Sequence, residues 1–256
     1  MHNLLREKLR RKEVTFGITL VLGTPEIPEA LANVGLDWMN FDMQHTTQDA
    51  GTLQPMIQAT SYSKTVPIIR VISNDLGLIN RALDTGAPGI IVPLVNSRED
   101  AEKAVRFAKY PPQGVRSYGI RSVALRDPEY TATANDEILI MPQIEAELAL
   151  RNLEEIVTTD GIDAIFVGPY DLTLSLGVFR QFDSSKYLKA VEKVVSTCEA
   201  HDVAPGLLAI AGPMDRIVEQ GFKLISLGGD LGFLVQNVTK ALKDARSVVG
   251  TSETRK

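Results

Sequence analysis

Three features of this 256-residue sequence predict a single-domain α/β fold, the (β/α)8 or TIM barrel. Apolar runs rich in Val and Ile recur eight times, and amphipathic stretches with helical spacing separate most of them. Eight strands with interleaved helices in about 250 residues are what such a barrel requires. No low-complexity linker interrupts the pattern. We therefore predict one domain over residues 1–256, with a doubly wound open sheet as the alternative.

The elements follow in chain order. A first helix carries the basic cluster Arg6–Lys12, which we interpret as its solvated face. The segment Pro111–Asn135 has neither pattern and is predicted to be an ordered excursion over the barrel mouth or toward a neighbouring subunit. The predicted strands are Thr15–Leu22, Trp38–Met43, Val66–Val71, Gly89–Val95, Ile138–Ile144, Ala164–Val167, Ala204–Ala209 and Lys223–Leu227. The predicted helices are Leu53–Tyr62, Leu78–Asp84, Ser97–Tyr110, Glu147–Val157, Tyr187–His201, Pro213–Gln220 and Leu231–Val248.

Composition limits the function classes. The net charge of -5 and the pI near 5.3 argue against nucleic acid or an anionic membrane as the main partner. No apolar run reaches the ~18 residues that a membrane span needs, and the N-terminus lacks the apolar core of a signal peptide. Cys198 is the only cysteine, so neither an intrachain disulfide nor a cysteine metal cluster is possible. We expect a cytoplasmic protein.

The predicted barrel places the candidate active site. Active sites of these barrels lie at the C-terminal ends of the strands, so the polar residues that follow each apolar run are the candidates. Together they supply carboxylates, a histidine, an arginine and an amide. They are Asp42, Gln44 and His45 after the second strand, Arg70 after the third, Gln143 and Glu145 after the fifth, and Gly168–Asp171 after the sixth.

Two carboxylates at consecutive strand ends are the strongest signal. Glu145 ends one apolar run and Asp171 follows the next, and a carboxylate at the end of a buried strand is costly without a partner. Two of them can converge on one divalent cation. The structural alternatives are that Glu145 is a carboxylate in the first turn of a helix and that Asp171 is a helix N-cap.

The remaining candidates fit enolate chemistry on a 2-oxo acid. A divalent ion would polarise the carbonyl, a cation would stabilise the developing enolate oxygen, and a base would move a proton. Arg70 is the cation, although an ion pair with Asp42 or Glu145 is its structural alternative. His45 is the candidate for proton transfer. Gln143 either binds the substrate or forms hydrogen bonds with backbone groups, and the sequence leaves both roles open.

Five segments together resemble the HpcH/HpaI aldolase family, in the same order from about Asn3 to about Ala245. Its members are metal-dependent class II pyruvate aldolases that act on 4-hydroxy-2-oxo acids, including 2-keto-3-deoxy sugar diacids. The segments are Asp42-Met43-Gln44-His45, Pro67-Ile68-Ile69-Arg70, Tyr110-Pro111-Pro112-Gln113-Gly114-Val115-Arg116, Gln143-Ile144-Glu145 and Gly168-Pro169-Tyr170-Asp171-Leu172.

The resemblance implies a role for each part of the site. Glu145 and Asp171 would hold Mg²⁺, Mn²⁺ or Co²⁺, and the substrate carboxylate would meet backbone N–H groups around Gly168, Pro169 and Tyr170. Arg70 would stabilise the enolate, Gln143 would orient the substrate and His45 would transfer protons. Asp42 and Gln44 would lie beside the metal ligands without binding the ion.

The resemblance also implies an assembly. Asp84, which the chain alone places on the opposite rim in a structural role, would support the histidine of a neighbouring active site. The family forms hexamers in which paired subunits exchange a C-terminal helix, and the apolar helix Leu231–Val248 would suit that exchange.

Two positions depart from the family pattern. Many relatives carry Glu where this chain has Gln44, which removes one negative charge beside the metal. Tyr170 replaces a small residue in the Gly-Pro-x-Asp motif. Both departures leave the metal ligands intact and bear on metal preference and substrate size.

The sequence therefore predicts an aldolase that reversibly cleaves a 4-hydroxy-2-oxo acid into pyruvate and an aldehyde. An oxaloacetate decarboxylase or a macrophomate-synthase-like lyase is the enzymatic alternative. A lyase acting on thioesters fits less well, because no basic patch for coenzyme A is evident. A sugar-acid-binding barrel without catalysis is the alternative from another class.

Overall fold

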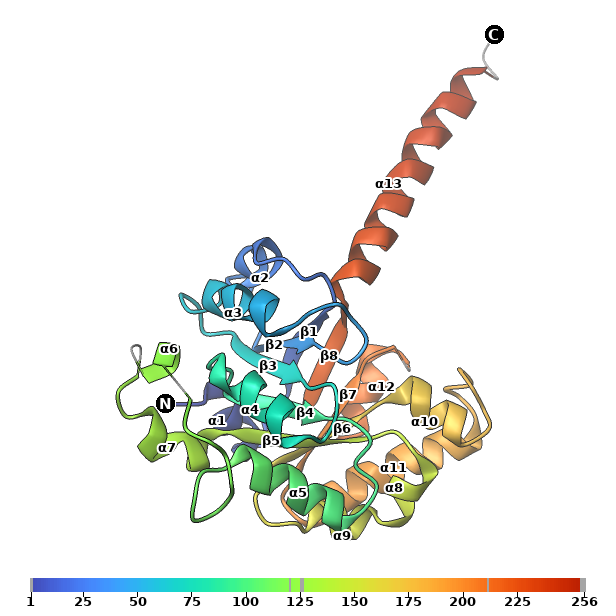
Figure 1. Ribbon diagram of the computed structural model, residues 1–256. Helices are drawn as coiled ribbons and strands as arrows, with labels where there is room; N and C mark the ends of the chain where they lie inside the picture. The colour runs from blue at the N-terminus through green and yellow to red at the C-terminus, as the bar shows by residue number, and fades with distance from the viewer. Residues whose placement is uncertain (1, 120, 125–126, 211, 254–256) are drawn as a thin grey trace.

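The computed structural model describes residues 2–119, 121–124, 127–210 and 212–253. Its eight strands are parallel, each pairs with the next along the chain, and β1 pairs with β8, so the sheet closes into a barrel (Figure 1). This confirms the predicted (β/α)8 barrel against the open sheet. The strands are β1 (Thr15–Leu20), β2 (Trp38–Asp42), β3 (Val66–Arg70), β4 (Gly89–Val92), β5 (Leu139–Ile144), β6 (Ala164–Val167), β7 (Ala204–Leu208) and β8 (Leu224–Gly229).

Helices cover the outside of the barrel, and four of the described ones, α2, α6, α7 and α10, were not predicted. Helix α2 has only six residues and contains Pro28, so it shows no helical repeat of apolar positions. The predicted excursion Pro111–Asn135 contains α6 and the start of α7, and its residues 120 and 125–126 lie outside the described ones. The helices are α1 (Leu4–Arg10), α2 (Glu26–Leu31), α3 (Ala50–Ala59), α4 (Leu76–Asp84), α5 (Arg98–Ala108), α6 (Arg121–Ala124), α7 (Tyr130–Glu137), α8 (Glu147–Arg151), α9 (Leu153–Val157), α10 (Pro169–Ser175), α11 (Ser185–Ala200), α12 (Met214–Glu219) and α13 (Asp230–Glu253).

The inside of the barrel is apolar at one end and polar at the other. Trp38 is fully buried near the start of β2 and packs edge-on against Phe166, with ring centroids 6.3 Å apart. Gly17 faces the indole so closely that a Cβ would lie 2.2 Å from Cδ2 of Trp38, which only glycine permits. Since alternate strand residues share a face, Asn40 and Asp42 follow Trp38 into the barrel toward its C-terminal end.

Helix α1 closes the N-terminal end of the barrel. Its residues Leu5 and Leu9 are buried in the same apolar cluster as Trp38. The prediction that the whole Arg6–Lys12 cluster is solvated was wrong for Arg6, which is buried and donates from Nε and Nη2 to Asp163 Oδ1 at 3.0 and 2.8 Å. The spacing of α1 that buries Leu5 and Leu9 also turns Arg6 inward, and the ion pair with Asp163 compensates its charge.

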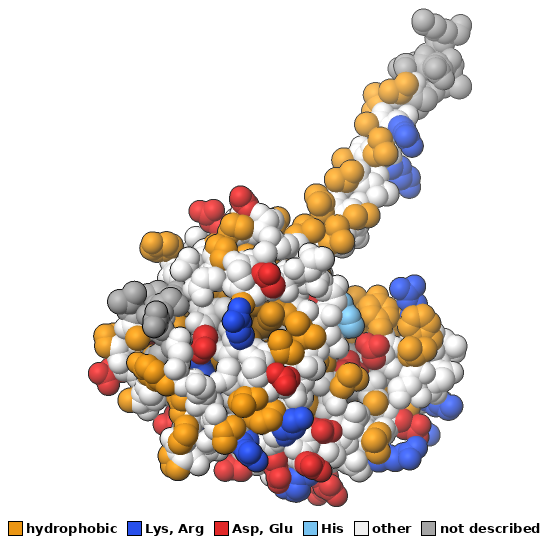
Figure 2. Space-filling model, viewed as in Figure 1, with side chains coloured by type: hydrophobic (Ala, Val, Ile, Leu, Met, Phe, Trp, Pro, Cys, Tyr) orange, Lys and Arg blue, Asp and Glu red, His pale blue; other side chains and the backbone are white. Residues whose placement is uncertain are grey.

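The last helix leaves the barrel. The 24-residue α13 projects from the end of β8 away from the other elements (Figure 1). Figure 2 shows apolar side chains along one side of α13 and basic ones on the other. Leu234, Val235 and Val238 on this helix are each more than half exposed. No helix in the described part of the chain is both long and apolar enough to cross a bilayer.

Candidate active site

A cavity of about 270 Å³ lies inside the C-terminal end of the barrel. Its wall combines apolar residues, a few converging polar groups and glycines, which is typical of a small-molecule site. Eight predicted site residues line it: Asp42, His45, Arg70, Gln143, Gly168, Pro169, Tyr170 and Asp171. The other wall residues are Thr19, Val21, Asn40, Phe166, Val167, Leu208, Gly228 and Gly229.

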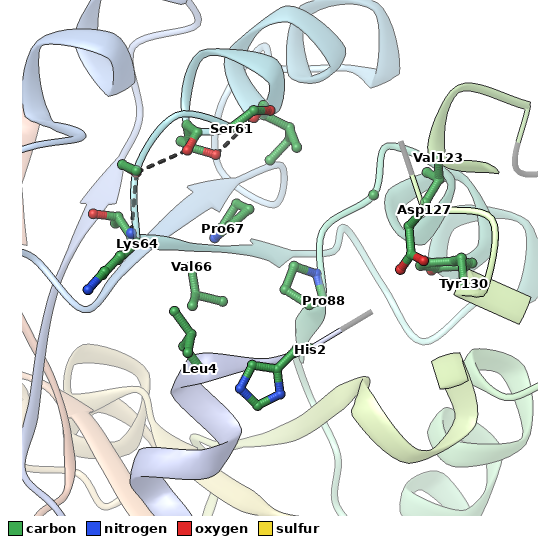
Figure 3. A pocket seen from close by; sticks show the side chains of 15 residues that line it. His2, Leu4, Ser61, Lys64, Val66, Pro67, Pro88, Val123, Asp127 and Tyr130 are labelled. Carbon is green, nitrogen blue, oxygen red and sulfur yellow. Dashed lines mark hydrogen bonds between the residues drawn. The ribbon is translucent and has the colours of Figure 1, made fainter. Parts of the chain in front are cut away.

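Another hollow lies at the opposite end of the barrel. It measures about 290 Å³ and is bordered by His2, Lys64 and Asp127, among others (Figure 3). None of the predicted site residues lines it. The candidate active site is therefore the cavity at the C-terminal end.

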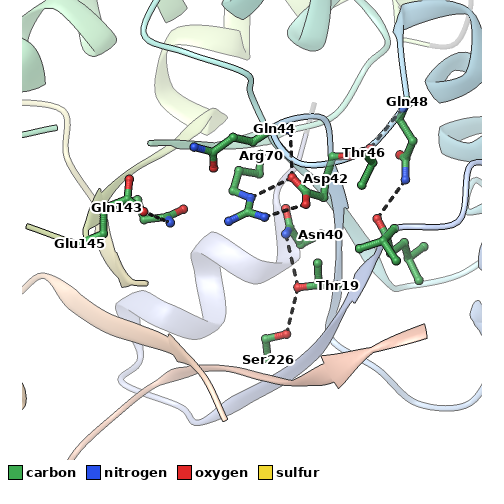
Figure 4. Close-up of polar contacts among 12 residues, drawn as sticks. Thr19, Asn40, Asp42, Gln44, Thr46, Gln48, Arg70, Gln143, Glu145 and Ser226 are labelled. Carbon is green, nitrogen blue, oxygen red and sulfur yellow. Dashed lines mark hydrogen bonds and ion pairs between the residues drawn. The ribbon is translucent and has the colours of Figure 1, made fainter. Parts of the chain in front are cut away.

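Asp42 and Arg70 form a forked ion pair across two neighbouring strands. The register of β2 and β3 places the two residues opposite each other. Arg70 donates from Nε to Oδ1 of Asp42 at 2.9 Å and from Nη2 to Oδ2 at 2.6 Å (Figure 4). Oδ1 also accepts the backbone N–H of Gln44 at 2.9 Å. Both side chains are largely buried, so the fork fixes the orientation of the guanidinium.

Glu145 lies just after β5, buried behind the cavity wall. Its Oε1 accepts the backbone N–H of Leu94 at 2.7 Å, and its Oε2 accepts the amide Nε2 of Gln143 at 2.5 Å (Figure 4). Burial raises the pKa of the Glu145 carboxyl above its ordinary value, and the charge of Asp171 raises it further. The hydrogen bonds from Leu94 and Gln143 and the charge of Arg70 oppose that rise in pKa only in part.

Neither carboxylate occupies the helix position that its structural alternative gave it. Helix α8 has Ala146 as its N-cap, so Glu145 precedes the helix and is not in its first turn. Helix α10 has Gly168 as its N-cap and Pro169 in its first turn, so Asp171 is a first-turn residue and not the N-cap. Asp171 is exposed to solvent, unlike Glu145. It comes from the first turn of α10 and not from the strand end itself.

Glu145 lies beside Gly168, and the charge of Asp171 acts on its carboxyl. Pairing of Ile144 with Val167 brings the ends of β5 and β6 together. A Cβ on Gly168 would lie 2.8 Å from Nε2 of Gln143 and 3.1 Å from Oε2 of Glu145, so glycine keeps the space beside the carboxylate open. The described residues contain no group of three or more His, Cys, Asp or Glu side chains able to hold a metal.

This donor set fits Mg²⁺, Mn²⁺ or Co²⁺. Mg²⁺ prefers oxygen ligands, and proteins commonly bind it through one or two carboxylates while substrate and water complete the shell. Glu145 and Asp171 supply two carboxylates of different exposure. In addition, Gln143 Oε1 is buried with no hydrogen-bond partner among the described residues, which leaves an acceptor at the same place.

His45 and Gln44 lie on the loop that follows β2. His45 is exposed and borders the cavity. The loop is tied to the barrel because the Thr46 hydroxyl donates to the carbonyl of Asp42 and the Gln48 amide donates to the carbonyl of Leu20 at 3.0 Å (Figure 4). Gln44 is half-buried, and its Oε1 has no hydrogen-bond partner among the described residues.

Asp84 is the one predicted catalytic residue that the single chain does not bring to the cavity. It ends α4, and its Oδ1 accepts Nη2 of Arg116 at 2.9 Å. The Arg116 side chain is fully buried, also donates to the Tyr130 hydroxyl at 3.0 Å and lies over the Tyr110 ring. Its contribution to the active site of a second subunit stays a prediction.

Two parts of the site were not predicted from the sequence. Leu94 holds Glu145 through its backbone N–H and has a φ of 57°, which is rare for this residue type and leaves no sequence signal. Below the carboxylates, Asn40 Nδ2, Thr19 Oγ1 and Ser226 Oγ form a polar layer with contacts of 3.4 and 3.2 Å (Figure 4). The alternation of inward residues on β2 would have indicated Asn40.

Fold and site together define a class, a (β/α)8-barrel enzyme with carboxylates at the barrel mouth. The chain belongs to the HpcH/HpaI aldolase/citrate lyase family, whose model matches residues 16–237. It is 32% identical over 246 residues to the 5-keto-4-deoxy-D-glucarate aldolase of an Escherichia coli strain, a match that covers 94% of this chain and 96% of that enzyme.

Solved structures agree with this assignment. A HpcH/HpaI aldolase from Desulfitobacterium hafniense superimposes with a TM-score of 0.89 at 30% identity, covering 96% of this chain and 97% of that one. The citrate synthase SbnG superimposes with a TM-score of 0.86 at 28% identity, covering 95% and 97%. The family and these relatives identify the chain as an enzyme of the aldolase and lyase type.

Proposed function

We propose that this enzyme is a divalent-metal-dependent aldolase that reversibly cleaves a 4-hydroxy-2-oxo acid into pyruvate and an aldehyde. The observation that carries the proposal is the position of the buried Glu145 beside Gly168, where the charges of Asp171 and Arg70 both act on its carboxyl. Its membership in a family of aldolases and lyases supports the same reaction class.

Each residue has a task in that reaction. Glu145 and Asp171 would hold Mg²⁺, Mn²⁺ or Co²⁺, which polarises the 2-oxo group of a bound substrate. Arg70 uses Nε and Nη2 on Asp42, and the rest of its guanidinium is free to donate to the substrate oxygen on which negative charge develops. Gln143 and the backbone from Gly168 to Tyr170 orient the acid.

His45 completes the set as the group that moves protons. Cleavage breaks the C3–C4 bond. The C4 hydroxyl loses its proton and becomes the aldehyde, and C3 gains a proton to give the methyl group of pyruvate. The exposed imidazole of His45 borders the cavity where that hydroxyl would lie, so it is our candidate for the base.

Metal content and an aldehyde panel test the proposal. Protein purified without added metal is analysed for bound ions, stripped with EDTA, and assayed with pyruvate and a series of aldehydes after Mg²⁺, Mn²⁺ or Co²⁺ is restored. We expect aldol formation that EDTA abolishes and metal restores. Activity that survives EDTA, or a pyruvate adduct trapped by borohydride, would point to a lysine imine instead.

The main alternative keeps the site and changes the reaction. Oxaloacetate decarboxylation, as in a macrophomate-synthase-like lyase, needs the metal and Arg70 but no base for a hydroxyl proton. Comparing aldol cleavage with oxaloacetate decarboxylation on one preparation separates the two. Faster decarboxylation with no aldol reaction would replace our proposal, and binding without either reaction would favour a sugar-acid-binding barrel. The cytoplasmic location stays a prediction.

We also propose that the enzyme is a hexamer in which paired subunits exchange α13. Leu234, Val235 and Val238 on the apolar face of α13 stay more than half exposed, so the described part of the chain does not bury that face. A second copy would cover that face and would bring Asp84 within reach of a neighbouring site. Light scattering should give six times the chain mass of 28.0 kDa. Replacing Leu234 and Val238 by Glu should yield smaller species, and an unchanged mass would contradict the exchange.

A further inference from the structure

One buried side chain in the wall of the cavity has a polar atom without a partner. Asn40, in the middle of β2, is 2% exposed and lines the cavity at the C-terminal end of the barrel. Its Oδ1 has no hydrogen-bond partner among the described residues. A buried acceptor without a hydrogen bond is costly. Because Asn40 lines the cavity, a molecule bound there can supply the donor.

Neighbouring hydroxyl groups fix which end of the Asn40 amide is free. The register of β1 and β2 pairs Thr19 with Asn40. Ser226 Oγ donates to the carbonyl of Gly228 at 3.3 Å, so the only proton of that hydroxyl is used. In the contact of 3.2 Å between Thr19 Oγ1 and Ser226 Oγ, the Thr19 hydroxyl is therefore the donor. Thr19 Oγ1 in turn accepts from Nδ2 of Asn40 at 3.4 Å (Figure 4).

This chain of hydrogen bonds gives the amide one orientation. Turning the amide over would place Oδ1 against Thr19 Oγ1, whose proton goes to Ser226, and two acceptors would then face each other. Nδ2 therefore stays on Thr19, and Oδ1 stays the free acceptor. A hydroxyl group of a ligand can donate to Oδ1, whereas a carboxylate or a carbonyl oxygen has no proton to offer.

Asn40 lies on the side of the barrel opposite the two candidate metal ligands. Glu145 follows β5 and Asp171 is in the helix after β6, whereas Thr19 and Asn40 are on β1 and β2. In a closed barrel of eight strands in chain order, β1 lies across from β5, and β2 lies across from β6. A 2-oxo acid whose carboxylate and oxo groups lie near Glu145 and Asp171 therefore extends its other half, which becomes the aldehyde, toward Asn40.

We infer that Asn40 determines specificity by accepting a hydrogen bond from a hydroxyl group on the aldehyde half of the substrate. This inference rests on the proposed function. A hydroxyl group satisfies Oδ1, whereas a methyl group in the same place leaves Oδ1 buried without a donor. Thr19 and Ser226 act through Asn40 as positioning residues, because they hold the amide in the orientation that presents Oδ1.

Two aldehydes of the same size test the inference. In glycolaldehyde a hydroxyl group stands where propanal has its methyl group, and the two molecules are otherwise alike. The value of kcat/KM for each is measured with saturating pyruvate and Mn²⁺, and the concentration of the free aldehyde form is determined by NMR. Because the two aldehydes also differ in intrinsic reactivity, the informative quantity is the ratio of the two values and its change on mutation.

Three variants and one control isolate the Asn40 amide. Asn40→Leu removes the acceptor and keeps the size of the side chain, so the ratio of glycolaldehyde to propanal should fall by about tenfold or more. Thr19→Val leaves residue 40 unchanged but removes the hydroxyl that holds Nδ2, so the ratio should fall by a smaller factor, even if Asn40→Leu folds poorly. Thr19→Ser keeps the hydroxyl and should keep the ratio. Asn33→Leu, the same exchange at an exposed position between α2 and β2, should also keep it.

Each outcome decides one of the two proposals. A ratio that stays at the wild-type value in Asn40→Leu and in Thr19→Val would overturn the inference and leave Asn40 as a structural residue of the barrel. If the wild type forms no aldol product from pyruvate with either aldehyde, the proposed function fails first, and the inference fails with it. Aldol formation with propanal together with an unchanged ratio thus refutes the inference alone.

Discussion

Replacing Glu145 with Gln is expected to stabilise the metal-free protein and to abolish its response to metal. Glu145 is only 4% exposed, and burial raises the pKa of its carboxyl. A carboxyl whose pKa is raised by folding contributes stability that is fully present below its unfolded-state pKa. That stability is lost as the pH rises through the folded-state pKa. At neutral pH the wild type without metal therefore carries a cost that Glu145→Gln removes.

The size of the effect follows from the contacts of Glu145. The Leu94 N–H still meets a carbonyl oxygen in the variant, and the Gln143 amide can turn so that its unpartnered Oε1 accepts from the new amide. With packing and hydrogen bonds kept, the gain is about 1 kcal/mol, as for other substitutions that optimise charge. In a protein of this size that raises Tm by roughly 2–4 °C. Mn²⁺ at a hundred times its Kd should stabilise the wild type by about 2.7 kcal/mol.

Thermal unfolding of EDTA-treated protein from pH 5 to 8, with and without Mn²⁺, measures both effects. The advantage of Glu145→Gln should grow as the pH rises, and Mn²⁺ should leave its Tm unchanged. Asp171→Asn is the matched control. Because Asp171 is exposed, its loss should change the metal-free stability by no more than about 0.5 kcal/mol while also abolishing the Mn²⁺ response. A Glu145→Gln variant that is less stable than the wild type at pH 8, or that keeps the full Mn²⁺ shift, would refute the reasoning.

Three further predictions test other parts of the site. Gly168→Ala places a Cβ 2.8 Å from Gln143 Nε2, so we expect a loss of about 1–3 kcal/mol in stability and weaker Mn²⁺ binding. Denaturant unfolding measures the stability and calorimetry measures the binding. Unchanged Mn²⁺ binding would mean that the ion lies elsewhere. Arg70→Lys cannot hold Asp42 with a fork and donate to the substrate at once, so kcat should fall by roughly 10²–10³, and retention of a third of wild-type kcat would make Arg70 an ion-pair strut. His45→Ala should slow aldol cleavage and proton exchange at the pyruvate methyl by roughly 10²–10⁴ but oxaloacetate decarboxylation little, since CO₂ leaves without proton transfer. Equal losses in all three reactions would remove the role of base from His45.

The sequence predicted the barrel because its strands are buried on both faces. Such strands appear as continuous apolar runs, and the runs identified all eight. Several predicted strands extended too far at the C-terminal end. Val71 and Val95, for example, are fully buried although they follow the ends of β3 and β4. Burial and sheet pairing end at different residues, and hydrophobicity reports only burial.

Contacts between distant segments were beyond prediction from the sequence. The burial of Arg6 depends on its ion pair with Asp163, which lies 157 residues further along the chain. The partner of Asp84 is Arg116, in a segment that has no strand or helix pattern at that position. For the same reason, the apolar face of α13 could be recognised from its sequence, but the surface that covers it could not.

The left-handed backbone of Leu94 and Arg180 could not be predicted from the sequence either, because neither residue type favours that conformation. Leu94 contacts Glu145 and Arg180 lies near the Tyr170 ring, and such backbone strain is retained only where neighbouring contacts enforce it. Leu94 has its hydrogen bond to Glu145, and Arg180 has the bond to Thr173 and the Tyr170 ring. Lys12 and Asp202 have the same left-handed backbone away from the site, so this conformation does not by itself mark a functional residue.

The charges at the C-terminal end of the barrel relate the Asp42–Arg70 ion pair to the two carboxylates Glu145 and Asp171. Asp42 and Arg70 neutralise each other through their fork, which leaves Glu145 and Asp171 as uncompensated negative charges. Because charges interact strongly only over short distances, each group needs compensation close by. A divalent ion held by the two carboxylates, as we propose, would lower the cost of burying Glu145 and would attract the carboxylate and oxo group of a 2-oxo acid.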